Sequence, residues 1–383
     1  MKKPVTFPPL VECRLMPVPA RFRGSLAVIA AVAALGAAGC EPSASGEPVP
    51  GDAAPAPRVE VVPAPSGGRI DVLVDGALFT SYLHADTLPV LKKPVLFPLK
   101  AASGATVTRG FPLEPRPGER VDHPHQIGLW LNYGDVAGLD FWNNSDAVPP
   151  DAAPRFGTIR HRAVRGTESG AGRGALDVTA DWQTHDGVRL LSEETRFVFF
   201  AADGLRGIDR TTTLSALDRR VALPDNKEGM LGLRVARALE HPSGRPEVLT
   251  GPDGRPAEAA VVDERGVTGH YRSSEEIEGE AVWGTRGRWL ALSGVVEADT
   301  VTVVVMDHPQ NVGFPTYWHA RGYGLFAANP LGQAALSDGR DVLDFALEPG
   351  TSTTFRYRIL LLDGAPDAET VEAYYEAFTD DTK

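Results

Sequence analysis

Two histidines lie two residues apart in the segment 122–136, DHPHQIGLWLNYGDV, which is also rich in aromatic residues. Side chains at positions i and i+2 of an extended segment point to the same side, so His123 and His125 could face one small substrate or one metal ion. Trp130 and, further along, Trp142 supply flat apolar faces that stack on sugar rings as readily as on other aromatics. This density favours a functional site over histidines that merely satisfy loop carbonyls.

The segment 307–330, DHPQNVGFPTYWHARGYGLFAANP, has a similar composition. It follows the strongly apolar run 300–306, which predicts a long loop at the edge of a sheet, and long loops on a rigid sheet often carry function. Within it, Trp318, His319 and Arg321 repeat the combination of aromatic ring, imidazole and cation that marks the first segment.

Two polar pairs need a separate interpretation. Lys227 and Glu228 open an alternating segment, and they form either a surface ion pair of little energetic value or a general base with its charge partner. The second interpretation requires that the pair lie beneath the histidine segments. Asp307 and His308 are predicted to cap a turn, because short polar side chains after a strand bond to nearby backbone.

The N-terminus has the features of an export signal. The apolar run 25–38 follows two arginines and precedes Gly39-Cys40, which is the order of a secretory signal peptide, and the run is too short to span a bilayer comfortably. Residues 37–40, Ala-Ala-Gly-Cys, resemble the lipobox of bacterial lipoproteins, in which the cysteine is acylated. We therefore expect an exported protein anchored by a lipid at Cys40 in the bacterial cell envelope, facing the periplasm or the surface. The alternative is an ordinary secretion signal with an incidental cysteine.

The composition after the signal predicts the domain organisation. The segment 41–68 consists of Pro, Ala, Ser and Gly with scattered charges and cannot bury enough apolar surface to offset its ordering entropy. We predict a signal peptide over 1–39 (with Met16 as an alternative start), a disordered tether over 40–68, and one domain over 69–383.

Charge and cysteine content exclude several functions. Lys+Arg 38 minus Asp+Glu 50 gives −12, and no basic run is interleaved with aromatics, so nucleic acid is excluded as a partner. The only two cysteines, Cys13 and Cys40, precede the predicted domain. The domain therefore has no disulfide framework, no thiolate metal cluster and no cysteine nucleophile.

From Arg69 onward the apolar residues alternate with a period of two, and Asp75-Gly76 predicts a hairpin turn. Only 366–379 has helical spacing, and no regular alternation of strand and helix is present, which excludes doubly wound and barrel α/β folds. These patterns predict a mainly β protein, a large antiparallel β-sandwich with a C-terminal helix. The predicted strands cover 104–111, 158–164, 175–184, 188–200, 205–217, 231–239, 288–296, 300–306, 324–328, 342–347 and 352–362.

Together, these segments resemble the PmoA-like family of exported bacterial proteins, which are often labelled "methane oxygenase PmoA". The resemblance covers roughly residues 69–363, nearly the whole predicted domain. It implies the supersandwich fold of galactose mutarotases and related sugar-active proteins. The activity of the membrane-embedded methane monooxygenase subunit does not follow from the label, because the chain has no membrane-spanning segment after its signal. The resemblance is carried by His123-Pro124-His125, Gly134-Asp135-Val136, Asp140-Phe141-Trp142, Lys227-Glu228-Gly229, Asp307-His308-Pro309 and Pro315-Thr316-Tyr317-Trp318-His319.

Our preferred hypothesis is an enzyme that acts on a carbohydrate or glycoside, without a distinction between hydrolase, lyase and epimerase. His125 and His319 would transfer protons, since the imidazole pKa of about 6.5 lets it accept and donate near neutral pH, and Glu228 would be their carboxylate partner. The predicted substrate-binding residues are His123, Trp130, Asn132, Asp135, Trp142, Lys227, Trp318, Arg321 and Asn329.

Two alternatives belong to other classes. In one, His123, His125 and His319 bind a divalent metal such as Zn, Cu or Fe, with Asp122 or Asp135 completing the ligands, as an oxygenase-like function would require. The spacing matches no strict metal motif. In the other, the domain is a glycan-binding module without catalysis, and its histidines have no task that requires titration.

Overall fold

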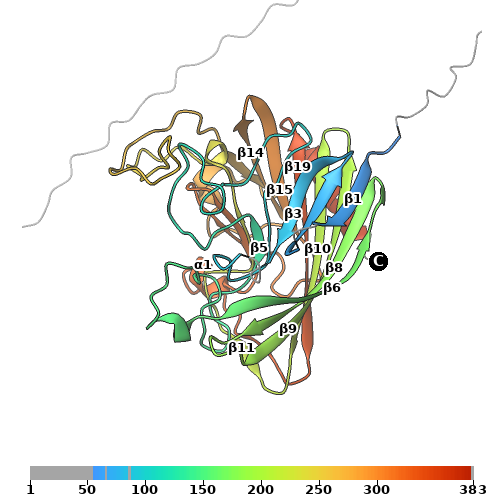
Figure 1. The fold of residues 1–383 in the computed structure, drawn as a ribbon, viewed down its shortest axis with the longest axis vertical. Coiled ribbons are helices and arrows are strands. Elements are labelled where there is room, and N and C mark those ends of the chain that lie inside the picture. The colour runs from blue at the N-terminus through green and yellow to red at the C-terminus, as the bar shows by residue number, and fades with distance from the viewer. Residues whose placement is uncertain (1–54, 65–66, 85–87, 381–383) are drawn as a thin grey trace, which may run out of the picture. The chain divides into compact units, whose positions relative to one another are not determined.

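The computed structural model describes residues 55–64, 67–84 and 88–380. The predicted signal peptide, the lipidation site at Cys40 and most of the predicted tether lie outside these residues and stay predictions. Within the described residues, no helix is long and apolar enough to cross a membrane. This part of the chain is dominated by antiparallel strands in two large sheets and one small sheet (Figure 1).

The larger sheet has nine strands and contains the segments singled out from the sequence. At its centre, Gly232 pairs with Trp130 on one side and with Ala327 on the other, so that three segments distant in sequence lie side by side. In spatial order the strands are β16 (Tyr317–Ala320), β17 (Leu325–Asn329), β12 (Leu231–Arg234), β5 (Leu129–Leu131), β4 (Val95–Leu96), β3 (Ala77–Leu83), β2 (Arg69–Val74), β1 (Arg58–Pro63) and β7 (Gly170–Ala171).

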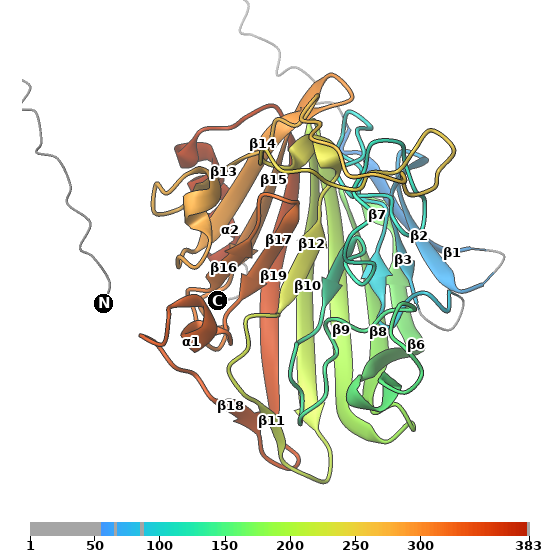
Figure 2. The ribbon, with the colours of Figure 1, turned by 90° about the vertical axis from the view of Figure 1, so that its left-hand side faces the viewer.

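The second sheet has eight strands, and its long neighbours β8, β9 and β10 form a continuous meander (Figure 2). A two-stranded sheet, short 3₁₀ turns and two α-helices complete the structure. In spatial order the eight strands are β13 (His270–Ser273), β14 (Trp289–Val296), β15 (Asp299–Asp307), β19 (Ser352–Asp363), β10 (Leu205–Ala216), β9 (Arg189–Ala202), β8 (Arg173–Gln183) and β6 (Thr158–Glu168). The remaining elements are β11 (Val221–Leu223), β18 (Phe345–Leu347), α1 (Gln333–Leu336), α2 (Ala368–Asp380) and the 3₁₀ turns η1 (Ala153–Arg155), η2 (Arg237–Leu239) and η3 (Gly279–Val282).

The main core lies between the two large sheets. Alternate residues of each strand point inward, for example Val72 on β2 and Leu129 on β5 from one sheet, and Ile208 on β10 and Ile359 on β19 from the other. A second apolar cluster covers the opposite face of the nine-stranded sheet, where Trp130 lies among loop residues. The nine-stranded sheet is therefore buried on both faces over its middle strands.

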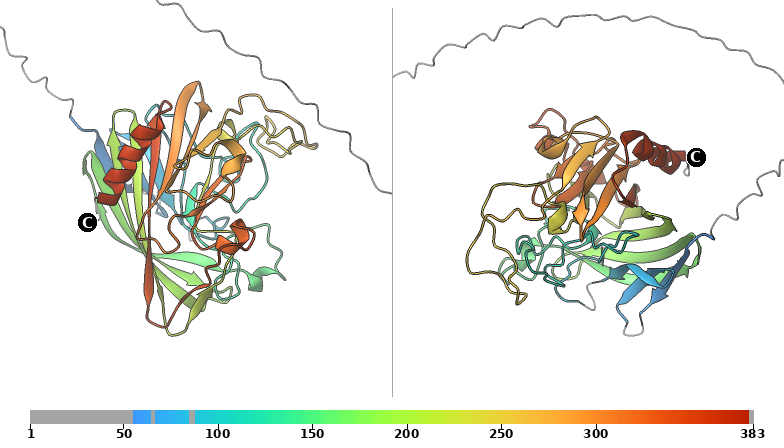
Figure 3. Two further views of the ribbon diagram at one scale, coloured as in Figure 1. Left: turned by 180° about the vertical axis from the view of Figure 1, so that it is seen from behind. Right: turned by 90° about the horizontal axis from the view of Figure 1, so that it is seen from above.

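The C-terminal helix α2 packs on the outer face of the eight-stranded sheet (Figure 3). Val371, Tyr375 and Phe378, spaced by four and three residues, form its buried stripe. They contact side chains of β14, β15 and β19, and the indole of Trp289 donates a hydrogen bond of 2.7 Å to Glu372. The helix thus shields apolar residues that an open sheet face would expose.

The predicted mainly-β sandwich with a C-terminal helix is confirmed. The predicted strands 158–164, 175–184, 188–200, 205–217, 288–296, 300–306, 324–328 and 352–362 correspond to β6, β8, β9, β10, β14, β15, β17 and β19. The turn at Asp75-Gly76 joins β2 to β3, and both residues have positive φ, 50° and 78°, as a two-residue hairpin turn of type I′ requires.

Four local expectations are wrong. The segment 104–111 forms isolated bridges only, and the strand expected over 231–239 ends at Arg234. The expected tether ends earlier than Gly68, because β1 pairs with β2 through backbone hydrogen bonds. His319 lies on the edge strand β16 and not in a loop.

Truncation of the helix stripe tests this packing. Phe378→Ala is expected to lower the free energy of unfolding by about 3 kcal/mol or more, since it opens a cavity against β15 and β19. Urea denaturation measures the change. Glu376→Ala, on the exposed side of the same helix, is the control and should cost less than about 0.5 kcal/mol. Equal effects of the two variants would show that α2 is not packed as described.

Candidate functional site

The edge strand β16 and the loop before β12 bring an imidazole and a carboxylate together. Trp318 points into the main core, so its neighbour His319 points to the opposite face of the sheet. There, Nδ1 of His319 lies 3.7 Å from Oε2 of Glu228, and Nζ of Lys227 lies 3.0 Å from Oε1 of the same carboxylate. The amide of Asn329 donates to the carbonyls of Asn226 and Lys227, both at 2.9 Å, and holds this loop against β17.

The segment before β5 places its two histidines on the same side of the sheet. The ring of His123 is stacked on Tyr323, with centroids 5.0 Å apart and parallel planes, and its centroid lies 5.7 Å from that of His125. His125 is 9% exposed, and its carbonyl accepts a hydrogen bond of 2.7 Å from the buried ammonium of Lys93. Because Tyr323 precedes β17, this stack joins the first histidine segment to the segment that carries His319.

Two buried arginines hold the histidine segment in place. Oδ1 of Asp122 accepts from Nη1 of Arg109 and from Nη2 of Arg234, each at 2.6 Å. Arg109 also donates to the carbonyls of His123 and Gln126, both at 3.0 Å. Burial alone would raise the pKa of Asp122, but the hydrogen bond from His123 and the charges of the two arginines lower it well below its usual value. Asp122 therefore stays ionised throughout the neutral range.

The two inner histidines are neutral at pH 7. Burial and, after it, the charges of the groups around it, Lys93 first, together lower the pKa of His125 to about 2. Burial also lowers the pKa of His319 to about 3, assisted by the positive charges of Arg321 and Lys227. Nε2 of His125 and Nδ1 of His319 are buried and have no hydrogen-bond partner among the described residues.

The sequence segments around 123, 228 and 319 thus converge on one face of the nine-stranded sheet. The charge of His123 is one of the causes that lower the pKa of both His125 and His319, so the ring of His123 lies near both of these residues. A cavity of about 510 Å³ opens beside the cluster. Among its lining residues are Asp122, His123, Glu280, Arg321 and Tyr323.

Several predicted binding residues lie elsewhere. The tryptophans Trp130, Trp142 and Trp318 are fully buried, so the prediction that they form walls for sugar stacking is wrong for this structure. Asn132 is equally buried; it accepts from the indole of Trp130 and donates to a backbone carbonyl. Asp135 accepts from the backbone of Gly138 and caps a turn. These side chains therefore contribute to the packing and hydrogen bonding of the fold.

The turn-capping role predicted for Asp307 is confirmed. Its carboxylate accepts from the amide of Asn311 at 2.7 Å and from the backbone N–H of Thr316 at 2.8 Å. Complete burial raises its pKa to about 7. His308 contributes in the same way, since its Nδ1 accepts from the backbone of Gln310 at 3.1 Å.

The residues proposed as metal ligands do not form a metal-binding group in this arrangement. Across the described residues, no three or more His, Cys, Asp or Glu side chains are arranged so that they could hold a metal ion. The ring of His123 lies parallel to the ring of Tyr323, which covers one of its faces. The carboxylate of Asp122 already accepts hydrogen bonds from two arginines. We derive no step through a metal.

Sequence reasoning missed the residues that support the histidines. Tyr323 lies within the segment 307–330 and Arg234 within the predicted strand 231–239, but neither had an assigned role. Arg109 and Lys93 lie outside them: Arg109 is a lone charge among apolar and small residues, and Lys93 forms with Lys92 an isolated pair of charges in an apolar run. Such isolated charges are a signal of buried pairing, because an unpaired buried charge is costly, but the partner is separated by more than ten residues in each case.

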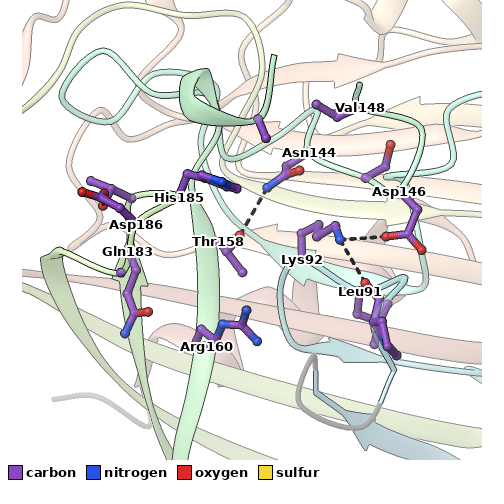
Figure 4. A pocket seen from close by; sticks show the side chains of 15 residues that line it. Leu91, Lys92, Asn144, Asp146, Val148, Thr158, Arg160, Gln183, His185 and Asp186 are labelled. Carbon is purple, nitrogen blue, oxygen red and sulfur yellow. Dashed lines mark hydrogen bonds and ion pairs between the residues drawn. The ribbon is translucent and has the colours of Figure 1, made fainter. Parts of the chain in front are cut away.

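A larger cavity of about 820 Å³ shares no residue with the predicted site. Figure 4 shows its polar side chains, among which Lys92 pairs with Asp146 at 2.7 Å and Asn144 donates to Thr158 at 3.3 Å. Asn144 also donates to the carbonyl of Gly157. Because these groups bond to one another, the unpartnered imidazoles mark the better candidate.

Comparison with known proteins identifies the family. Residues 69–376 match DUF6807, a family of unknown function. The chain belongs to this family. No curated protein matches the chain. The resemblance to the PmoA-like proteins stays a prediction.

Several solved structures show limited similarity to this DUF6807 chain. The α-galactosidase AgaB from Geobacillus stearothermophilus, of glycoside hydrolase family 36, is 11% identical over 80% of this chain and 41% of its own, with a TM-score of 0.38. The Slr1438 protein from Synechocystis sp. PCC 6803 is 11% identical over 80% and 96%, with a TM-score of 0.29. A galactose mutarotase related enzyme from Lactobacillus acidophilus is 10% identical over 80% and 97%, with a TM-score of 0.27. The chain spans about two-fifths of the length of the α-galactosidase.

One isosteric substitution tests how much the carboxylate of Asp122, shared by Arg109 and Arg234, stabilises the fold. Asp122→Asn is expected to lower the free energy of unfolding by about 3 kcal/mol or more, because it leaves two buried guanidinium groups without their counter-charge. Urea denaturation gives the value, and Asp151→Asn on the exposed surface serves as the control. A loss below about 1 kcal/mol would mean that the arginines do not depend on Asp122.

The neutral state of His319 predicts a dependence of stability on pH. Its folded pKa of about 3 lies below the unfolded value of about 6.5, so the stabilisation is fully present above pH 6.5 and is lost as the pH falls towards 3, where the unfolded chain binds the extra proton. His319→Gln should therefore reduce the slope of unfolding free energy against pH, between about pH 6 and 4, by about 1 kcal/mol per pH unit. Urea unfolding at several pH values measures the slope. An unchanged slope would contradict the low pKa.

Proposed function

We propose that the protein acts on a carbohydrate at the cavity beside His123, with His319 and Glu228 as the proton-transfer pair. One observation carries this proposal. Three segments about a hundred residues apart converge, so that His123 lines an open cavity, Nε2 of His125 is buried without a partner, and Nδ1 of His319 is buried 3.7 Å from the carboxylate of Glu228. Unpaired buried polar atoms are costly, so their retention favours a ligand that completes them.

The chemistry of the site suits sugar hydroxyls. A hydroxyl both donates and accepts, and a neutral imidazole offers one donor and one acceptor nitrogen. The stacked rings of His123 and Tyr323 take the place of the buried tryptophans as a flat face at the cavity, because both residues are partly exposed there.

His319 is better suited to proton transfer than His125. When a substrate hydroxyl loses its proton to His319, its O–H bond breaks and an N–H bond forms on the ring, which becomes positively charged. Glu228, 3.7 Å from Nδ1, stabilises that charge, as a carboxylate does for a catalytic imidazole. The charges that lower the pKa of His125 come from the cations Lys93, Arg109 and Arg234 and from His123, so His125 is better suited to hydrogen bonding with a hydroxyl.

A second candidate is a glycan-binding module without turnover. It is favoured by the low pKa values of His125 and His319, since imidazoles that resist protonation serve well as fixed hydrogen-bond partners. Either activity would operate outside the cytoplasm if the export signal and the lipid anchor at Cys40 are used, which we propose as the cellular context.

A turnover screen on sugars and glycosides tests the proposal. Glu228→Gln and His319→Gln should each lower kcat by about a hundredfold or more, the usual contribution of a general acid–base group, and the double variant His125→Ala/His319→Ala should abolish turnover. Circular dichroism checks that each variant is folded.

The exposed pair His270 and Glu278, 3.2 Å apart on β13 and the turn after it, provides the matched control. His270→Gln and Glu278→Gln should leave kcat unchanged. Turnover that survives in the double variant would remove His125 and His319 from the mechanism, and binding without any turnover would favour the module.

A further inference from the structure

Arg321 differs from the cations next to the histidines because it forms no ion pair with a described carboxylate. Its guanidinium lies over the ring of Trp283, with Cζ 4.6 Å from the centroid, and it lines the cavity together with His123. Within the described part of the chain, its side chain has no hydrogen bond and no ion pair. In contrast, Arg109 and Arg234 share Asp122, Arg120 is bonded to Glu240, and Lys227 is paired with Glu228.

The stacked geometry prepares this guanidinium for a planar anion. An arginine pinned by its face to an indole keeps its N–H donors in the ring plane, free for a bidentate contact. A carboxylate matches this fork with two parallel hydrogen bonds, and the charge assistance makes them about twice as strong as neutral ones.

The surrounding charges favour an anion at the same place. Burial lowers the pKa of His319 and of His125, and neighbouring cations lower it as well: Arg321 and Lys227 for His319, and Lys93, Arg109 and Arg234 for His125. Glu280 is the opposing feature, because its exposed carboxylate also lines the cavity. The cavity is thus lined by two cations without an ion pair among the described residues, Arg321 and the exposed Arg245, and by the exposed imidazole of His123. Arg120, which also lines it, is paired with Glu247.

We propose that the ligand of this cavity is a sugar that carries a carboxylate, a uronic acid or a glycan containing one, and that Arg321 binds this carboxylate while the imidazole of His123 binds a hydroxyl. This inference rests on the proposed function, since it names the substrate class of the same site.

Calorimetric titration of the purified protein with five monosaccharides tests the inference. D-Galacturonate and D-glucuronate should bind at least about tenfold more tightly than galactose and glucose. Glucose 6-sulfate should bind more weakly than the uronates, because a sulfate ester is a weaker hydrogen-bond acceptor than a carboxylate. Arg321→Gln should weaken uronate binding by about ten- to a hundredfold, the range for hydrogen bonds to charged groups, and should weaken neutral-sugar binding much less. Arg321→Lys should restore only part of the loss, because an ammonium lacks the fork.

Glu280→Gln is the matched control of opposite charge at the same cavity. This substitution should strengthen the binding of the uronates and leave the affinity for galactose unchanged. Three outcomes would overturn the inference and leave the proposed function standing. They are neutral sugars that bind as tightly as the uronates, a sulfated sugar that binds best, or an equal loss of affinity for both sugar classes in Arg321→Gln. No binding of any of these sugars to the wild type, together with no turnover in the screen above, would overturn both.

Discussion

The carboxylate of Asp122, shared by Arg109 and Arg234, is the contact on which the arrangement of the site depends. Arg234 is the last residue of β12, in the middle of the nine-stranded sheet, and Arg109 lies in the segment that crosses that sheet. Two guanidinium groups cannot be buried side by side without a counter-charge, and Asp122 supplies it at 2.6 Å to each. Because His123 follows directly in sequence, the position of the histidine segment is set by an ion pair and not by a flexible loop.

The same burial that strengthens this pair determines the chemistry available to the histidines. In a low-dielectric surrounding the charged form of an imidazole is disfavoured, and the nearby cations add to the effect. His319 has a carboxylate 3.7 Å away that can offset a transient charge, whereas the charges that lower the pKa of His125 are mainly cationic. Two histidines that look equivalent in the sequence therefore acquire different capacities, one for proton transfer and one for hydrogen bonding.

Much of the fold could be predicted from the sequence because period-two patterns in long strands such as β9 and β10 are strong local signals. The strand β1 was missed since its short run lies between prolines and depends on pairing with β2 and with β7, which is distant from it in sequence. The tryptophans were misassigned for a related reason. Whether Trp130 faces solvent depends on the loop residues that cover the outer face of β5, and no local pattern reports that layer.

The position of the cavity follows from where this apolar layer ends. Over β3, β4 and β5 the outer face of the nine-stranded sheet is covered by apolar loop residues such as Phe97 and Ile127, which hold the loops rigidly. Towards β16, polar side chains replace them on the same face, beginning with Tyr323 and Arg234, whose guanidinium lies 4.9 Å from the tyrosine ring. An apolar floor that gives way to polar groups has the form of most small-molecule sites, since the apolar part fixes the geometry and the polar part selects the ligand. The extent of the second apolar layer thus determines which part of this sheet face carries the cavity.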